Sequence, residues 1–109
     1  MDITLDSINP NDQILIRTQN SEYRFSILDP GERRGTLSGG TLGEQVRDAV
    51  LVGTLSDKNN SLDNVSTGLK TGRRALFYLT ARNGIERLIT SIITSVARNK
   101  HREEGKRAA

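Results

Sequence analysis

Arginine is the side chain in this sequence with the greatest capacity for chemistry, because it makes up 12 of the 16 basic residues. Its planar guanidinium binds two phosphate oxygens at once, which a lysine ammonium does not do. The charge is unevenly distributed. Residues 1–69 carry six basic and ten acidic groups, whereas residues 70–109 carry ten basic and three acidic groups. The C-terminal part would therefore attract phosphates, unless its charges pair with those of the acidic N-terminal part.

This distribution predicts a nucleic-acid-binding surface. Small barrels bind single strands by combining a basic groove with aromatic platforms, and Tyr78 is the one aromatic residue that we expect to be exposed. Asn20 and Ser21 could contact a ligand beside Arg17, although such residues commonly bond their own backbone in turns. The predicted nucleic-acid-binding residues are Arg17, Arg24, Arg33, Arg34, Arg73, Arg74, Tyr78, Arg87 and Arg98.

Several kinds of chemistry are excluded by residue types that the chain lacks. There is no cysteine, which excludes disulfides and thiolate metal sites. The only histidine, His101, lies in a charged segment, so a histidine-based triad or metal cluster is not expected. The glycine-rich stretches do not match the phosphate-binding P-loop pattern. We therefore predict a protein that is not an enzyme and uses no metal or cofactor.

The chain also lacks the apolar segments of a membrane or exported protein. No apolar run approaches the roughly 20 residues of a membrane-spanning helix. The N-terminus, "MDITLDSINPNDQ", lacks the basic and apolar regions of a signal peptide. We expect a cytoplasmic protein of bacterial type that does not associate with a membrane.

The first half of the chain predicts a three-stranded antiparallel meander over residues 13–38. The segment "QILIRT" is rich in β-branched residues, and "YRFSILD" alternates with the period of a half-buried strand, so Tyr23 and Phe25 would face the core. The polar turn between the two segments would place Asn20 at a positive φ. The "DPGE" turn would use Gly31 in the left-handed conformation before the chain returns as "RRGTLSGG".

The second half predicts two further strands and one long loop. "AVLVGTLS" (49–56) is apolar on both faces and would form an inner strand, with Gly53 at a bulge or a close crossing. The polar residues 57–68 would form the loop. "RRALFYLT" (73–80) would form a strand that turns its apolar face, including Phe77, toward the core.

Residues 85–99 stay open between helix and strand on their pattern alone. The apolar positions fall within one half of a helical wheel, which is typical of an amphipathic helix. The same segment is dense in isoleucine, threonine and valine, whose branched side chains favour a strand. A strand with so few charges would need burial on both faces.

Two stretches, "IRTQNSEYRFSILDP…RRGTLSGG" and "TSIITSV", together resemble a group of small uncharacterised bacterial proteins. This group shares an R-T-x-N-S-x-Y hairpin, a G-x-L-x-G-G return, a G-x-x-L-x-F-type strand and a late T-S-x-V-x-x-I strand. The resemblance covers most of residues 13–97 and implies a compact all-β barrel with a strand at 85–99. It implies no functional residues. The matching residues are Arg17, Thr18, Asn20, Ser21, Tyr23, Gly35, Leu37, Gly39, Gly40, Thr90, Ser91, Ile93 and Val96.

Together these observations predict one all-β domain over residues 1–98, an antiparallel barrel of five or six strands that is SH3-like or related. The alternative is an α+β fold with a C-terminal helix at 85–98. Residues 99–109 would form a charged, disordered tail. We expect a binding module for RNA or DNA without strong base specificity. The alternative is a protein-interaction or assembly module that uses an edge strand or the apolar segment 85–97.

Overall fold

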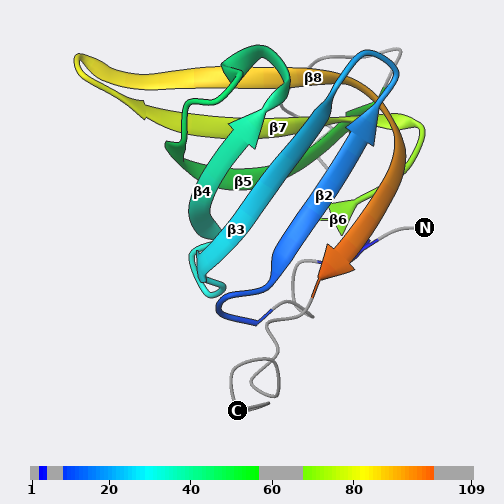
Figure 1. Ribbon diagram of the computed structural model, residues 1–109, viewed down its shortest axis with the longest axis horizontal. Helices are drawn as coiled ribbons and strands as arrows, with labels where there is room; N and C mark the ends of the chain where they lie inside the picture. The colour runs from blue at the N-terminus through cyan, green and yellow to red at the C-terminus, as the bar shows by residue number, and fades with distance from the viewer. Residues whose placement is uncertain (1–2, 5–8, 57–67, 100–109) are drawn as a thin grey trace.

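Six antiparallel strands close into a barrel in the order β2-β3-β4-β5-β7-β8 (Figure 1). The computed structural model describes residues 3–4, 9–56 and 68–99, so the predicted loop at 57–67 and the residues after 99 lie outside the described part. The predicted all-β antiparallel barrel is confirmed. Its strands are β2 (Gln13–Thr18), β3 (Glu22–Asp29), β4 (Arg34–Gly39), β5 (Arg47–Ser56), β7 (Arg73–Ala81) and β8 (Gly84–Asn99), and a 3₁₀ turn η2 (Gly40–Leu42) follows β4.

A second, two-stranded sheet is formed by β1 (Ile3–Thr4) and β6 (Gly68–Leu69). It joins the chain ahead of the barrel to the segment that precedes β7, with Ile3 opposite Leu69. The Leu69 side chain is fully buried in the main core, and Thr54 of β5 donates a hydrogen bond to the Gly68 carbonyl. The small sheet is therefore anchored to the barrel through β6.

The barrel interior is filled by the alternate residues that the pattern assigned to the core. On β3, the side chains of Tyr23, Phe25 and Ile27 are buried while their neighbours face outward. Phe25 meets Phe77 of β7 edge to face, with ring centroids 5.3 Å apart and planes at 67°. Aromatic pairs favour this arrangement because a ring edge is positive and a ring face negative. The predicted core positions of Tyr23, Phe25 and Phe77 are confirmed.

The segment that permitted either helix or strand is a single 16-residue strand, β8. The predicted strand is thus confirmed, and the alternative helix at 85–98 does not form. β8 is the longest strand and curves around the barrel (Figure 1). Its first half pairs with β7 and its last half pairs with β2, which closes the barrel. The burial on both faces that we expected of this strand is not found, since only Thr90, Ile93 and Val96 of its 16 residues are buried and Ile85 is 74% exposed. Hydrogen bonding to β7 and β2 holds β8 as a strand.

Threonine hydroxyls occupy the irregular points at which β8 bends. Between its pairs with Arg74 and Leu76 the register shifts. Here the Ala75 N–H donates to the Thr90 hydroxyl at 3.0 Å, and that hydroxyl donates to the Ser91 carbonyl at 2.7 Å. A second shift in register lies where β8 changes its pairing partner from β7 to β2. There the Thr94 hydroxyl donates to the Arg17 carbonyl. The hydroxyls bond backbone groups that the bulged ladder leaves unpaired.

Replacing Thr90 by valine should destabilise the protein by about 2 kcal/mol, because the buried Ala75 N–H would lose its acceptor while the side-chain volume stays the same. Denaturant unfolding measures the change. Thr94→Val is the matched control, since its hydroxyl makes a similar bond in an exposed position, and we expect a loss below about 1 kcal/mol. Equal losses in the two variants would show that burial of Thr90 is not the cause.

The residues that take a positive φ in the turns are not the ones that we predicted. Neither Asn20 nor Gly31 does so, and these two predictions were wrong. In the β3–β4 turn the left-handed residue is Arg33, at φ 56°. The Arg33 N–H donates to the Pro30 carbonyl, so the turn closes one residue later than the predicted turn of residues 29–32. The predicted bulge at Gly53 is confirmed, since the β5 register shifts between Leu51 and Gly53.

Candidate functional site

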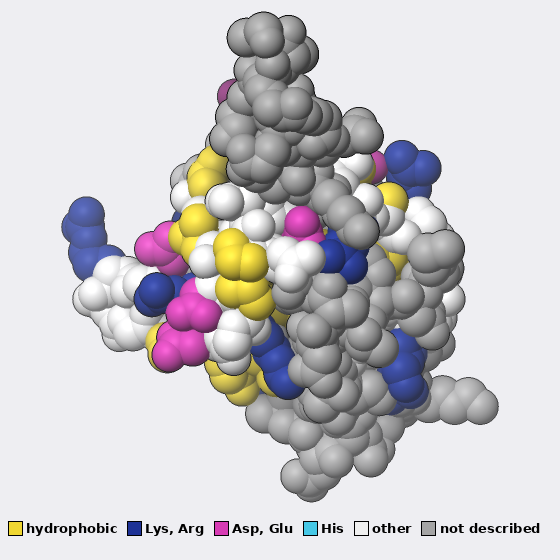
Figure 2. Space-filling view, turned by 90° about the horizontal axis from the view of Figure 1, so that it is seen from below, with side chains coloured by type: hydrophobic (Ala, Val, Ile, Leu, Met, Phe, Trp, Pro, Cys, Tyr) yellow, Lys and Arg dark blue, Asp and Glu magenta, His cyan; other side chains and the backbone are white. Residues whose placement is uncertain are grey.

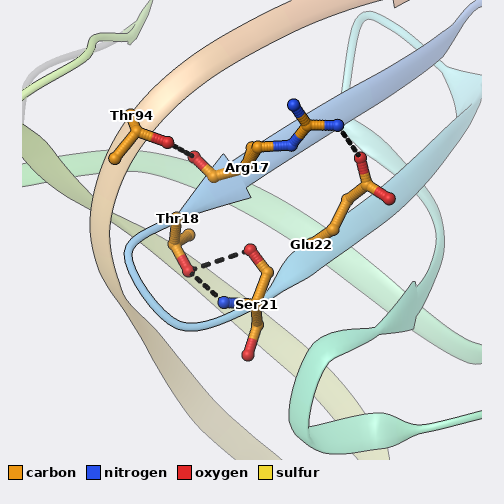
Figure 3. Close-up of polar contacts among 5 residues, drawn as sticks. All are labelled: Arg17, Thr18, Ser21, Glu22 and Thr94. Carbon is orange, nitrogen blue, oxygen red and sulfur yellow. Dashed lines mark hydrogen bonds and ion pairs between the residues drawn. The ribbon is translucent and has the colours of Figure 1, made fainter.

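The β2–β3 turn is built around the hydroxyl of Thr18 (Figure 3). This hydroxyl accepts hydrogen bonds from the N–H groups of Ser21 and Asn20, at 3.0 and 3.3 Å, and donates to the Ser21 carbonyl at 3.1 Å. The Asn20 amide donates to the Ser91 hydroxyl of β8 at 2.7 Å. The turn therefore needs no positive φ, because a side chain takes the place of the usual backbone bond. Asn20 is bonded to β8 through its side chain and Ser21 to Thr18 through its backbone, and their contact with a ligand stays a prediction.

The glycine pair after β4 wraps around Tyr23. The Tyr23 hydroxyl lies 3.3 Å from the Thr41 hydroxyl and accepts the Thr41 N–H at 3.4 Å. A Cβ at Gly40 would lie 2.1 Å from the tyrosine ring, so only glycine fits against the ring at this point. Packing alone accounts for the glycine-rich return, and a backbone nest for an anion is not needed to explain it.

Two of the predicted arginines are committed to ion pairs. Arg17 reaches Glu22 at 3.1 Å on the exposed surface, where the two side chains are 66% and 44% exposed (Figure 3). Arg98 contacts Asp12 with two nitrogens, at 2.7 and 2.9 Å, and the Asp12 side chain is only 3% exposed. The second pair joins the acidic N-terminal part of the chain to the basic C-terminal part. Some of the C-terminal charge is therefore neutralised within the fold.

Arg73 and Arg74, at the start of β7, are also involved in the structure of the barrel. Both residues are half-buried and their Nε atoms are fully buried, and each makes polar contacts of its own. Neither side chain projects freely into solvent as the predicted phosphate contacts would require. These two arginines are left out of the candidate site.

The remaining predicted arginines make no ion pair with the residues that the structure describes. They are Arg24, Arg33, Arg34 and Arg87. Arg24 lies opposite Leu15 and Ser38, apart from the others. The view in Figure 2 shows basic, acidic and hydrophobic side chains interspersed on one face, without a continuous basic stripe over its described residues. The nine predicted residues do not form one surface.

The strand register brings Arg34, Tyr78 and Arg87 together. Arg34 of β4 lies opposite Val50 of β5, Val50 opposite Tyr78 of β7, and Tyr78 opposite Arg87 of β8. Paired residues share a face of the sheet, and this face is the outer one because the sequence neighbours on β4, β5 and β7 are buried. We call these four residues the arginine–tyrosine row. At the usual spacing between strands it is roughly 14 Å long.

The arginine–tyrosine row combines two groups suited to a single-stranded nucleic acid. The two arginines are exposed and can each bind a phosphate with a bidentate fork. Tyr78 lies between them on the outer face and is half-buried beside Val50, less exposed than predicted, and the part of its side chain that reaches the surface could contact a base. A cavity of about 280 Å³ adjoins the row and is lined by Leu28, Arg34, Asp48 and Thr80. The sequence contained no signal for Leu28, Val50, Asp48 or Thr80, because only strand pairing places them here.

A larger cavity, of about 470 Å³, lies at the end of the barrel beside the β7–β8 hairpin. Arg47 crosses it, donating to the Thr80 carbonyl at 3.0 Å and pairing with Glu86 at 3.0 Å. Its main polar groups therefore satisfy one another, which gives the cavity little to offer a ligand. Its lining residues are Gln45, Val46, Arg47, Thr80, Ala81, Arg82 and Glu86.

Within the described ranges, no cluster of three acidic, histidine or cysteine side chains is arranged to hold a metal ion. The same residues include no helix long and apolar enough to cross a membrane. Comparison of the chain with protein-family models, with curated proteins and with solved structures found no match.

Proposed function

We propose that this protein is a non-enzymatic, cytoplasmic binding module that holds single-stranded nucleic acid on the arginine–tyrosine row. The observation that supports the proposal is the register, which places two exposed arginines on either side of a half-buried tyrosine on the outer face. Arginine forks bind phosphates and a tyrosine ring stacks on a base, and both are needed to hold a flexible strand. Duplex DNA would offer its phosphates to the arginines but not an unstacked base to Tyr78.

Most of the affinity would come from the phosphates. The row has few groups that read base edges, so affinity should depend weakly on sequence and strongly on salt. The measurement is a fluorescence-anisotropy titration of RNA and DNA oligonucleotides, single-stranded and duplex, at two salt concentrations. Binding that weakens steeply with salt is expected for the single strands. Absence of binding at the lower salt concentration would rule the proposal out.

Single substitutions in the arginine–tyrosine row should separate the contributions of phosphate binding and of base stacking to the affinity. Arg34→Ala and Arg87→Ala should each weaken binding and reduce the slope of log K against log salt by about 0.7, the value for one lost phosphate contact on a single strand. Tyr78→Ala should weaken binding by about 1–3 kcal/mol at both salt concentrations, because stacking is insensitive to salt.

Arg24→Ala is the matched control for these variants. Arg24 is exposed, lies on a strand and forms no ion pair within the described part of the chain, but it is outside the row. Its removal changes the net charge by the same amount and should leave the salt slope nearly unchanged. If all three arginine variants lose equal affinity, binding depends on diffuse charge and the row is not the site.

The alternative function, a protein-interaction module, is favoured by one observation. The first half of β8, over residues 84–91, pairs with β7 on one edge, and no described strand pairs with its other edge. Figure 1 shows this hairpin extending beyond the barrel. An extended segment of a partner could add a strand there. Co-purification from a lysate with and without nuclease distinguishes the two functions. A protein partner remains bound after nuclease treatment, whereas a nucleic acid does not.

A further inference from the structure

The cavity beside the arginine–tyrosine row has walls of unlike chemistry. Leu28, Arg34, Asp48 and Thr80 line it, one from each of the strands β3, β4, β5 and β7. Leu28 is 56% exposed and forms the apolar wall of the cavity. Asp48 and Thr80 lie two residues along their strands from Val50 and Tyr78 and so point to the same face. The cavity and the row are parts of one continuous surface, with Arg34 in both.

The two charged groups of this cavity do not neutralise each other. Arg34 and Asp48 lie on adjacent strands and line the same cavity, but no ion pair joins them. Neither makes an ion pair with another described residue. The guanidinium fork therefore keeps its donors available, and the carboxylate keeps its two acceptor oxygens available, to a ligand placed between them.

The ligand that fits these groups is a planar ring with two donors on one edge and two acceptors on another. A carboxylate accepts two parallel N–H bonds, and a guanidinium donates two. Among the nucleic-acid bases, guanine alone offers both edges, with N1–H and the N2 amine on one and O6 and N7 on the other. Cytosine, adenine and uracil each lack at least one of these pairs. Leu28 would cover the apolar face of the ring.

We infer that the cavity formed by Leu28, Arg34, Asp48 and Thr80 selects guanine within a single strand bound on the arginine–tyrosine row. In this arrangement Asp48 accepts from the N1–H and N2 amine. Arg34 donates two of its five N–H groups to O6 and N7 and keeps the others for the neighbouring phosphate, so it serves both the base and the backbone. The inference rests on the proposed function and changes one part of it, because it adds base selectivity at a single position. The rest of the strand is still held without regard to sequence.

The test uses labelled five-nucleotide RNAs of uridine with one variable central base. Guanine at the centre should bind about tenfold to a hundredfold more tightly than uracil or adenine, the range for one or two bidentate base contacts. Hypoxanthine keeps O6, N7 and N1–H but lacks the N2 amine, so its affinity should lie between those of guanine and uracil. Equal affinity for all four RNAs overturns the inference.

The Asp48→Asn variant should change the affinity for two RNAs in opposite directions. The all-uridine RNA should bind this variant more tightly, because a negative charge beside the phosphates is removed. The guanine RNA should lose its advantage, because asparagine no longer offers two acceptor oxygens. Asp48 is exposed, so the variant should fold, and thermal unfolding checks this. A guanine preference that survives unchanged in Asp48→Asn overturns the role of Asp48.

The outcomes also separate this inference from the proposed function. Steep salt dependence with equal affinity for every central base supports the row and overturns the guanine site. Failure of every RNA to bind at low salt overturns both. Guanine preference that disappears in both Asp48→Asn and Arg34→Ala, and persists in Arg24→Ala, supports both.

Discussion

A Gly35→Ala variant is expected to lose about 3 kcal/mol of stability or more, a large share of the 5–15 kcal/mol typical of a domain. Gly35 lies on β4 opposite Ile27 of β3. A Cβ built at this position would lie 2.0 Å from the Ser26 carbonyl oxygen and 2.9 Å from its carbon. These are backbone atoms of a paired strand, so they cannot move aside as the end of a flexible side chain could. Circular dichroism and denaturant unfolding measure the loss.

Gly31→Ala is the matched control for this variant. Gly31 is exposed, has no positive φ, and its added Cβ would be 3.4 Å from a side-chain oxygen of Asp29. Alanine should be tolerated there and could raise stability slightly by restricting the unfolded chain. If Gly35→Ala unfolds with a loss below about 1 kcal/mol, then β3 and β4 separate easily at this point and the barrel is less tightly packed than the structure indicates.

An Arg98→Met variant is expected to lose about 3 kcal/mol, because it removes the cation from a nearly buried carboxylate. Methionine keeps much of the apolar stem of arginine, so the loss reports on the charge. The pair also joins the end of β8 to the chain ahead of β2, where the barrel closes. Denaturant unfolding gives the change in stability. Adding Asp12→Asn should recover part of the loss, because the buried charge is then removed as well.

Arg17→Met provides the comparison, since Arg17 also pairs with a carboxylate on the barrel. That pair is exposed, and exposed pairs contribute roughly 0–1 kcal/mol. We expect its loss to be below about 0.5 kcal/mol. Similar losses in Arg17→Met and Arg98→Met would mean that burial of Asp12 does not determine the strength of its pair.

These contacts divide the arginines of the chain into two groups. Arg98 and Arg17 hold other parts of the protein, and Arg73 and Arg74 are half-buried. Among the arginines that the structure describes, those that remain for a phosphate are exposed ones such as Arg34 and Arg87. A count of positive charges along the sequence cannot make this division, because the pairing of Arg98 depends on a carboxylate at the other end of the chain.

Much of the fold could be predicted from local patterns. Alternation identified β3 and its core residues, and the density of branched residues in β8, together with the resemblance, favoured a strand over a helix. The predicted positive φ values at Asn20 and Gly31 were wrong for a shared reason. In each turn a hydrogen bond that residue preferences do not encode determines the geometry. The Ser21 N–H donates to the Thr18 hydroxyl in one turn, and the Arg33 N–H donates to the Pro30 carbonyl in the other.

The grouping of residues in the candidate site could not be predicted from the sequence. Tyr78 and the two arginines of the row were on the list of expected residues, but so were six arginines that lie elsewhere. The neighbours Val50 and Asp48 were not expected. Which side chains lie side by side across a barrel depends on strand order and register, and a shift of one residue would turn Tyr78 inward.

By itself, therefore, the sequence determined the class of the fold, its core residues and the absence of thiolate chemistry, because these depend on residue type and on periods within one strand. The tertiary structure alone decided which arginines are neutralised, why the motif residues Thr18, Asn20 and Thr90 are present, and which charges flank Tyr78. Those outcomes depend on pairs of residues that are far apart in the chain and meet only when β8 closes the barrel against β2.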